Sequence, residues 1–222
     1  MRITETEQQR HFIYLDFPEP ANQPYGGTMT SPTIKSAMTA DEAAVIDVVT
    51  LAFSTDPVAR WIYPNPYQYV THMPPLIKAF AGKAFAHGSA YYVDGYAGAA
   101  LWLPPEVHPD GEKLVSWIQR TVSVWVQDEF LSVFEQMGRY HPKEPHWYLP
   151  LIGVETIHQG YGYGSALMEH ALLPCDRDQT LAYLESSNPR NISLYQRHGF
   201  EILGTIQVGT SPPLFPMLRK PH

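Results

Sequence analysis

The segment from Thr156 to His170, TIHQGYGYGSALMEH, places three glycines at alternate positions between an apolar run and an expected helix. The first turn of a helix has N–H groups without partners and a partial positive charge, so it attracts anions. At Gly160, Gly162 and Gly164 no side chain keeps an anion away from the backbone. The pattern therefore predicts a loop that binds phosphate or pyrophosphate, although a tight turn alone would also use glycines.

Two common phosphate loops fit this segment poorly. The loop of nucleotide hydrolases requires Gly-Lys followed by Ser or Thr, and here Ser165 directly follows Gly164. A dinucleotide-binding fingerprint that begins at Gly160 would need glycine or alanine where Ser165 stands. The pattern that remains is Gln-x-x-Gly-x-Gly, formed by Gln159, Gly162 and Gly164.

This pattern resembles the acetyl-CoA loop of the GNAT superfamily of acyltransferases, in which such an arch holds the pyrophosphate of CoA. A second segment, NPRNISLYQRHGF, is similar to a strand–helix segment of that superfamily that ends in Tyr-x-x-x-Gly-Phe, here Tyr195, Gly199 and Phe200. From about His141 onward the chain is similar to puromycin N-acetyltransferase-like proteins. Its N-terminal half matches them loosely, chiefly around LAFSTDPVARWIYP. The resemblance implies the GNAT fold and acetyl-CoA as the co-substrate.

The resemblance also implies which residues hold CoA. The strand over residues 149–155 is expected to splay from its parallel neighbour near Pro150, which leaves the backbone of Ile152 and Val154 for pantetheine. The N–H of Val154 would then polarise the thioester carbonyl. Asn191 resembles the superfamily's CoA-contacting asparagine, and by itself would indicate a helix N-cap. The expected CoA-binding residues are Ile152, Val154, Gln159, Gly160, Tyr161, Gly162, Tyr163, Gly164, Ser165 and Asn191.

Acyl transfer from a thioester to an amine requires a neutral amine at the moment of attack and protonation of the departing thiolate. Tyr195 is the expected general acid from its place in the motif, because a phenol with a pKa of about 10 is protonated at working pH. The alternative is a tyrosine that packs its helix on the sheet. Glu185, near the end of its strand, is the first candidate for the base, followed by Glu155 and His146. Each of these three has a structural alternative, and a water chain could replace a single base.

The expected secondary structure has an α/β order. An N-terminal arm is expected over residues 1–30, and a single domain is expected over residues 31–222. This domain should have a central mixed sheet with splayed parallel strands and flanking helices. Strands are expected over residues 33–36, on either side of a two-residue turn at Asp94-Gly95, and over 146–156, 180–186, 200–208 and 213–220. A helix is expected after a capping box at Thr39 and Glu42, and another over residues 76–86 with Pro74 and Pro75 in its first turn. Further helices are expected over residues 111–138, as one helix or two, and over 162–173 and 191–199. Two-residue alternation places His146, Tyr148, Pro150 and Ile152 on one face.

The composition indicates a globular protein and excludes several other classes. The 222 residues are 44% hydrophobic and 17% charged, which suits the core of one domain. The formal net charge is −7 with scattered Lys and Arg, so nucleic acid is not an expected partner. The single cysteine, Cys175, gives neither an internal disulfide nor a zinc framework, and we expect no metal. No apolar run has the length of a membrane span, which favours a cytoplasmic protein without a membrane partner.

These observations predict an acetyl-CoA-dependent N-acetyltransferase that transfers an acetyl group directly to a primary amine of a small molecule. The acidic balance favours a cationic amine, and an aminonucleoside or similar antibiotic is the acceptor suggested by resemblance alone. Some aromatic residues could line an acceptor site, although core packing is their commoner use: Trp61, Tyr63, Tyr67, Trp117 and Trp125. Two alternatives stay open: acetylation of a protein or peptide amine, and a CoA-binding GNAT-like module without turnover. A homodimer is also left open.

Overall fold

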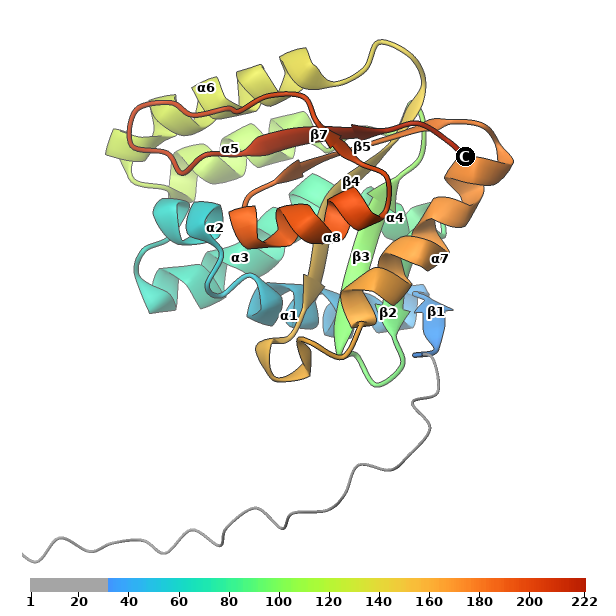
Figure 1. The fold of residues 1–222 in the computed structure, drawn as a ribbon. Coiled ribbons are helices and arrows are strands. Elements are labelled where there is room, and N and C mark those ends of the chain that lie inside the picture. The colour runs from blue at the N-terminus through green and yellow to red at the C-terminus, as the bar shows by residue number, and fades with distance from the viewer. Residues whose placement is uncertain (1–31) are drawn as a thin grey trace, which may run out of the picture. The chain divides into compact units, whose positions relative to one another are not determined.

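The computed structural model describes residues 32–222, and the N-terminal arm predicted over residues 1–30 lies outside the described residues. The described residues form a seven-stranded sheet with the order β1-β2-β3-β4-β5-β7-β6 (Figure 1). The strands are β1 Ile34–Ser36, β2 Ala90–Val93, β3 Gly98–Leu103, β4 His146–Val154, β5 Leu181–Ser186, β6 Glu201–Ile202 and β7 Phe215–Arg219. The β4–β5 pair is parallel and the other pairs are antiparallel, which confirms the predicted mixed α/β sheet.

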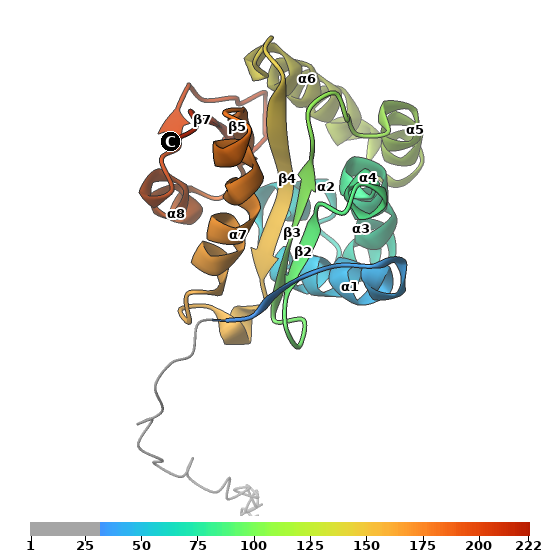
Figure 2. The same cartoon turned by 90° about the vertical axis from the view of Figure 1, so that its right-hand side faces the viewer.

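Helices cover both faces of this sheet (Figure 2). The helices are α1 Glu42–Ala52, α2 Pro57–Ile62, α3 Pro66–Ala81, α4 Lys83–Ala86, α5 Gly111–Thr121, α6 Val124–Tyr140, α7 Tyr163–Arg177 and α8 Ile192–Arg197. Short 3-10 helices precede three of them: η1 Thr39–Asp41, η2 Thr156–His158 and η3 Pro189–Asn191. α7 and α8 lie on one face, and α1, α3 and α4 lie on the other (Figure 2).

The sheet separates two hydrophobic cores. One core includes the buried Tyr63, Ile77 and Leu101 and lies beneath α1, α3, α4 and α5. The other includes Trp102 and Leu167 and lies beneath α7. Because α7 begins within the glycine-rich segment, packing of this second core fixes the direction in which the N-terminus of α7 points.

β4 contains a bulge at Pro150 that changes its register. Leu101 of β3 pairs with Leu151, whereas Leu103 pairs with Tyr148, so β4 carries one extra residue between these two pairs. An extra residue bends the bulged strand and increases its twist. Proline suits such a place because it has no N–H to donate to a neighbouring strand.

The bulge makes the predicted alternation along β4 wrong beyond Pro150. Tyr148 belongs to the core beneath α1 and α3, whereas Ile152 packs against the core beneath α7. His146 and Ile152 therefore do not share a face, because one inserted residue moves all later side chains to the opposite face of the sheet.

The parallel strands β4 and β5 separate where the bulge begins. They pair from His146 with Leu181 to Leu149 with Leu184, and beyond this point each strand continues without the other. The separation confirms the predicted splay near Pro150. The gap opens at the carboxyl ends of two parallel strands, which is where α/β sheets commonly bind ligands.

The helix predicted over residues 76–86 begins earlier than expected. α3 starts at Pro66 and is followed by the short α4, so Pro74 and Pro75 lie inside α3 rather than in its first turn. The Asn65 side chain accepts hydrogen bonds from two N–H groups of this first turn, at 2.9 and 3.1 Å. Asn-Pro at the N-cap and first helical position is the stronger start signal.

Two predicted turns differ from the structure in detail. The capping box uses Asp41, whose carboxylate accepts the Met38 N–H at 2.8 Å, rather than Thr39 and Glu42. The predicted hairpin is present as β2 and β3, but the connection is the four residues 94–97 instead of two. Neither difference changes which elements neighbour each other in the sheet.

Candidate active site

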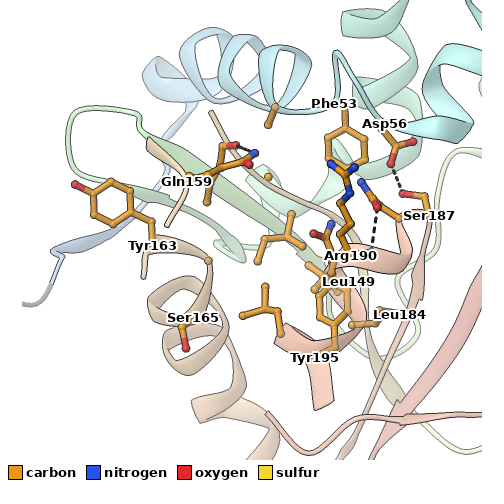
Figure 3. Close-up of a pocket in the computed structure, with 18 of the residues that line it drawn as sticks. Phe53, Asp56, Leu149, Gln159, Tyr163, Ser165, Leu184, Ser187, Arg190 and Tyr195 are labelled. Carbon is orange, nitrogen blue, oxygen red and sulfur yellow. Dashed lines mark hydrogen bonds between the residues drawn. The ribbon is translucent and has the colours of Figure 1, made fainter. Parts of the chain in front are cut away.

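A cleft of about 500 Å³ lies at the gap between β4 and β5 (Figure 3). Its walls come from the end of α1, the splayed ends of β4 and β5, the glycine-rich loop, η3 and α8. The predicted site residues that line it are Ile152, Val154, Gln159, Gly160, Gly162, Tyr163, Gly164, Ser165, Glu185, Asn191 and Tyr195. Tyr161 does not line the cleft, and its side chain is exposed.

The glycine-rich loop presents the N-terminus of α7 to the cleft. Gly162 is the N-cap of α7 with φ of 81°, and Gly160 has φ of 85°. No side chain caps this helix, and the N–H of Ala166 is the one that reaches back to the Gly162 carbonyl. The first-turn N–H groups before it therefore have no partner within the helix and can bind an anion.

Gly164 contributes to the loop by allowing close packing, and Ser165 contributes its backbone N–H. A Cβ at Gly164 would lie 3.3 Å from the Leu194 side chain, so this glycine lets α7 approach α8 closely. The Ser165 hydroxyl lies 2.8 Å from His198 Nε2 and donates to Glu169 at 3.3 Å. The backbone N–H of Ser165, rather than its hydroxyl, is thus the group available to a ligand.

The free edge of β4 offers backbone groups along the gap. The Glu155 N–H donates to the Ala97 carbonyl at 3.0 Å, which fixes the residues that bond to β3. Because bonding direction alternates along an antiparallel pair, the N–H and C=O groups of Ile152 and Val154 point away from β3. Gln159 Nε2 already donates to the Val154 carbonyl at 3.1 Å (Figure 3). The N–H groups of Ile152 and Val154 and the Ile152 carbonyl remain for a ligand.

Tyr195 lines the cleft from α8 and is otherwise buried. Its ring packs against Phe200 with a centroid separation of 6.3 Å. Burial raises the pKa of Tyr195, and the nearby charge of Asp56 raises it further. The hydroxyl therefore stays protonated throughout the neutral range and can donate to a developing thiolate, although burial makes complete proton transfer more costly than for an exposed phenol.

Of the three candidate bases, the one that lines the cleft is Glu185. It directly follows the last residue of β5 that pairs with β4, and its side chain is 3% exposed. Glu155 lies 3.2 Å from His158 Nδ1 and does not line the cleft. His146 also lies outside the cleft, and His141 stands between it and Glu185.

Comparison with known proteins gives the same superfamily from sequence and from structure. Residues 120–202 match the family described as Acetyltransferase (GNAT) domain. The chain has the GNAT fold. It is an acyltransferase, so the fold and the enzyme class expected from the sequence are both confirmed.

The relatives found are N-acetyltransferases of several kinds. An uncharacterised N-acetyltransferase of Schizosaccharomyces pombe is 27% identical over 193 residues, which cover 77% of this chain and 76% of that protein. A Corynebacterium glutamicum structure, described as a histone acetyltransferase and related acetyltransferase, is 28% identical with a TM-score of 0.66, over 87% of this chain and 98% of its own. Arylalkylamine N-acetyltransferase 2 of Aedes aegypti shares the fold at 12% identity and a TM-score of 0.61, over 87% and 100% of the two chains.

An apolar pocket of about 110 Å³ adjoins the cleft. The two cavities share Phe53, Asp56, Pro150, Glu185 and Ser187. The apolar wall is built mainly from Ile62, Met73, Leu76, Phe80, Phe130, Val133, Phe134 and Met137. None of the aromatic residues considered from the sequence lines it, and two of those, Tyr67 and Trp125, are exposed.

Asp56 joins the two cavities and was missed in the sequence. Its carboxylate caps α2 by accepting the Val58 and Ala59 N–H groups at 3.0 Å each, and it also accepts the Ser187 hydroxyl (Figure 3). Burial raises the pKa of Asp56, against the lowering effect of these three hydrogen bonds. Asp-Pro at the start of α2 was the available signal, because it is a common N-cap pair.

Arg190 and Arg197 are further cleft residues that sequence reasoning missed. Both lie in the NPRNISLYQRHGF segment and place two positive charges in the lining of the cleft. The Arg190 N–H donates to Asn188 at 3.1 Å, which holds the η3 turn. These cations suit the phosphate groups of a nucleotide-containing ligand.

Within residues 32–222, no cluster of three or more His, Cys, Asp and Glu side chains has the arrangement of a metal site. Across the same stretch, no helix combines the length and apolar character that a bilayer crossing requires.

Proposed function

We propose that this GNAT protein transfers the acetyl group of acetyl-CoA directly to a primary amine of a small molecule. The observation that carries the proposal is the meeting of two unlike cavities at Glu185: a polar cleft with a helix N-terminus and cations, and an apolar pocket. A donor with phosphates suits the first cavity, and the body of an amine suits the second. Glu185 stands between them, where a proton must be removed.

The residues of the cleft fit CoA. A Cβ at Gly160 or Gly162 would meet no atom within 4 Å, so the backbone of the loop faces open space in which a pyrophosphate can approach. Arg190 and Arg197 add positive charge nearby. The free N–H and C=O groups of β4 match the amide groups of pantetheine, which would lie in the gap as an added strand.

Backbone and side-chain groups of the cleft each serve a different step of acetyl transfer. Acetyl-CoA supplies the activated acetyl group. The Val154 N–H is placed to donate to the thioester oxygen as negative charge develops there. Glu185 takes the proton that the amine must lose, and Tyr195 donates to the departing sulfur. Direct attack by the amine needs no nucleophilic side chain.

The volume and chemistry of the apolar pocket indicate a compact apolar amine. An engineered apolar cavity of about 150 Å³ binds benzene, so this smaller pocket of about 110 Å³ suits a short alkyl chain, or one ring that extends into the adjoining cleft. The ammonium end would lie near Asp56 and Glu185 at the mouth. An aminonucleoside is too large to enter this pocket whole, and a protein acceptor would require an open groove.

The first experiment is calorimetric titration with acetyl-CoA, followed by thiol release with phenethylamine, butylamine, spermidine, puromycin and a lysine peptide. The lone Cys175 is buried, and burial raises its pKa to about 12, so it adds little background to a thiol reagent. We expect acetyl-CoA binding and release with the first two amines. Release only with the peptide would support a protein acceptor. Binding without release from any amine would support the non-catalytic module, and absence of binding would contradict the proposal.

The charge and cysteine content support a cytoplasmic place of action. A net charge of −7 favours a cationic small molecule over nucleic acid as the partner. A single buried thiol suits a reducing compartment.

A further inference from the structure

We propose that Glu185, His141 and His146 form a proton relay that carries the amine proton away from the active site to solvent. The proposal rests on the proposed function for the source of the proton. It adds two histidines that do not line the cleft and that the general chemistry of acetyl transfer does not require.

The three side chains form one continuous row. His141 Nε2 lies 3.4 Å from Glu185 Oε1, and His141 Nδ1 lies 3.0 Å from His146 Nε2. His146 Nδ1 lies 2.8 Å from the Glu144 carbonyl oxygen. Glu185 Oε1 is buried, and its 3.4 Å contact with His141 Nε2 is an ion-pair distance rather than a formed hydrogen bond.

The Glu144 carbonyl oxygen, at the end of the row, determines which nitrogen of each histidine donates and which accepts. A backbone carbonyl only accepts, so His146 must carry its proton on Nδ1. Neutral His146 then accepts at Nε2, which requires the proton of His141 to be on Nδ1. In a neutral His141 the lone pair of Nε2 would face the lone pairs of Glu185 Oε1. The proposal therefore places one proton between these two atoms, where it removes the repulsion.

This shared proton makes the relay necessary for the base. Glu185 can accept a proton from the amine only when His141 passes its Nδ1 proton to His146. The amine N–H bond breaks, one proton enters at Glu185, and one proton leaves from His146 Nδ1 to water. Each imidazole gains one proton and loses one, and exchange with solvent restores the starting tautomers.

The residues packed around the row favour transfer of the proton along it. Tyr148 and Tyr183 enclose the His141 ring at centroid separations of 4.6 and 4.3 Å. Burial and the charge of Glu185 raise the pKa of both tyrosines, so neither releases a proton. Burial lowers the pKa of His146, and so do the charges of His141 and His108, while the Glu144 carbonyl and the Glu185 charge oppose this. His146 therefore passes a proton rather than retaining it.

The far end of the row opens into a recess separate from the cleft. This recess has a volume of about 240 Å³, and the polar residues that line it are Glu106, His108, His141, Lys143, Glu144 and His146. Glu144 is exposed, which gives water access to the end of the row. A proton can leave by this route while the donor and the amine fill the cleft and the apolar pocket.

A test that needs no acceptor uses the ring nitrogens. In the full-length protein labelled at histidine, 15N spectra assigned with His141→Ala and His146→Ala report each tautomer from about pH 5 to 9. We expect His146 protonated at Nδ1 and His141 protonated at Nδ1, with Nε2 of His141 losing its proton in Glu185→Gln. A His141 ring protonated only at Nε2, or spectra unchanged in Glu185→Gln, would overturn the relay. This test stands even when no amine is acetylated.

A second test uses the best amine from the thiol-release screen. His141→Ala should lower kcat by about 10-fold to 100-fold, with an unchanged Kd for acetyl-CoA. Added imidazole should restore part of the loss through the recess. The control Lys143→Ala removes another side chain that lines the recess and is outside the row, and should keep full activity. A His141→Ala enzyme with the wild-type pH profile and no imidazole rescue would contradict the proposal.

Discussion

The Ser187 hydroxyl donates to Asp56 Oδ2, a carboxylate 131 positions earlier in the chain. This bond ties the start of α2 to the end of β5, at the boundary that the cleft shares with the apolar pocket. The same carboxylate caps α2 and raises the pKa of Tyr195 by its charge. One buried acid thus links a helix start, a strand end and the expected general acid.

Replacement Asp56→Asn should change the pH dependence of stability. Burial raises the pKa of Asp56 above its ordinary value of 3.8, so the folded state binds a proton more tightly than the unfolded state. The contribution of Asp56 to stability is therefore full below pH 3.8 and falls as the pH rises through the raised value. An asparagine keeps the cap without titrating.

Urea unfolding of both proteins at acid and neutral pH measures this effect. The free energy of unfolding of the wild type, measured relative to that of Asp56→Asn, should be lower at neutral pH than at acid pH. A relative stability that rises with pH would mean that the hydrogen bonds to Asp56 outweigh its burial.

The segments with strong local signals were predictable from sequence. The glycine-rich loop and α7 follow from the glycines and a helical apolar stripe, and β5 follows from a short apolar run. The splay was expected near Pro150 through resemblance, and the structure supplies its local cause in the bulge.

The contacts that complete the site were not predictable in the same way. His141 meets Glu185 across 44 positions of the sequence, and Asp56 meets Ser187 across 131. Each depends on the path of the sheet, and no spacing within either segment encodes it. The bulge at Pro150 was also missed, because period-two alternation assumes an unbroken ladder.

Replacement Gly162→Val should weaken CoA binding by more than tenfold. Valine is strained at a φ of 81°, and its side chain would enter the space that the loop leaves open. Calorimetry with acetyl-CoA measures the loss. Gly88→Val is the matched control, because Gly88 also has a positive φ of 63° and open space around it but does not line the cleft. Equal CoA affinity in both variants would count against the assignment of the loop.

Replacement Tyr195→Phe should lower kcat by about 10-fold to 100-fold and leave the affinity for acetyl-CoA unchanged. The ring stays and keeps its packing against Phe200, so stability should change little. Because burial raises the pKa of Tyr195, the wild-type rate should show no loss from tyrosine ionisation up to about pH 10. Equal turnover of the two enzymes in the thiol-release assay would remove Tyr195 from the mechanism.

Filling the apolar pocket should select against the larger amines. Val133 is buried in α6 and lines the pocket, so Val133→Phe removes space for a ring and should raise the KM for phenethylamine by about 10-fold or more. Butylamine should be affected less, and the affinity for acetyl-CoA should stay the same. Val70→Phe is the control, because Val70 is 60% exposed on α3 and outside the pocket. The converse change, Phe134→Leu, enlarges the pocket and should improve turnover of a naphthylalkylamine. If neither pocket variant alters the preference among amines, the acceptor binds elsewhere along the cleft.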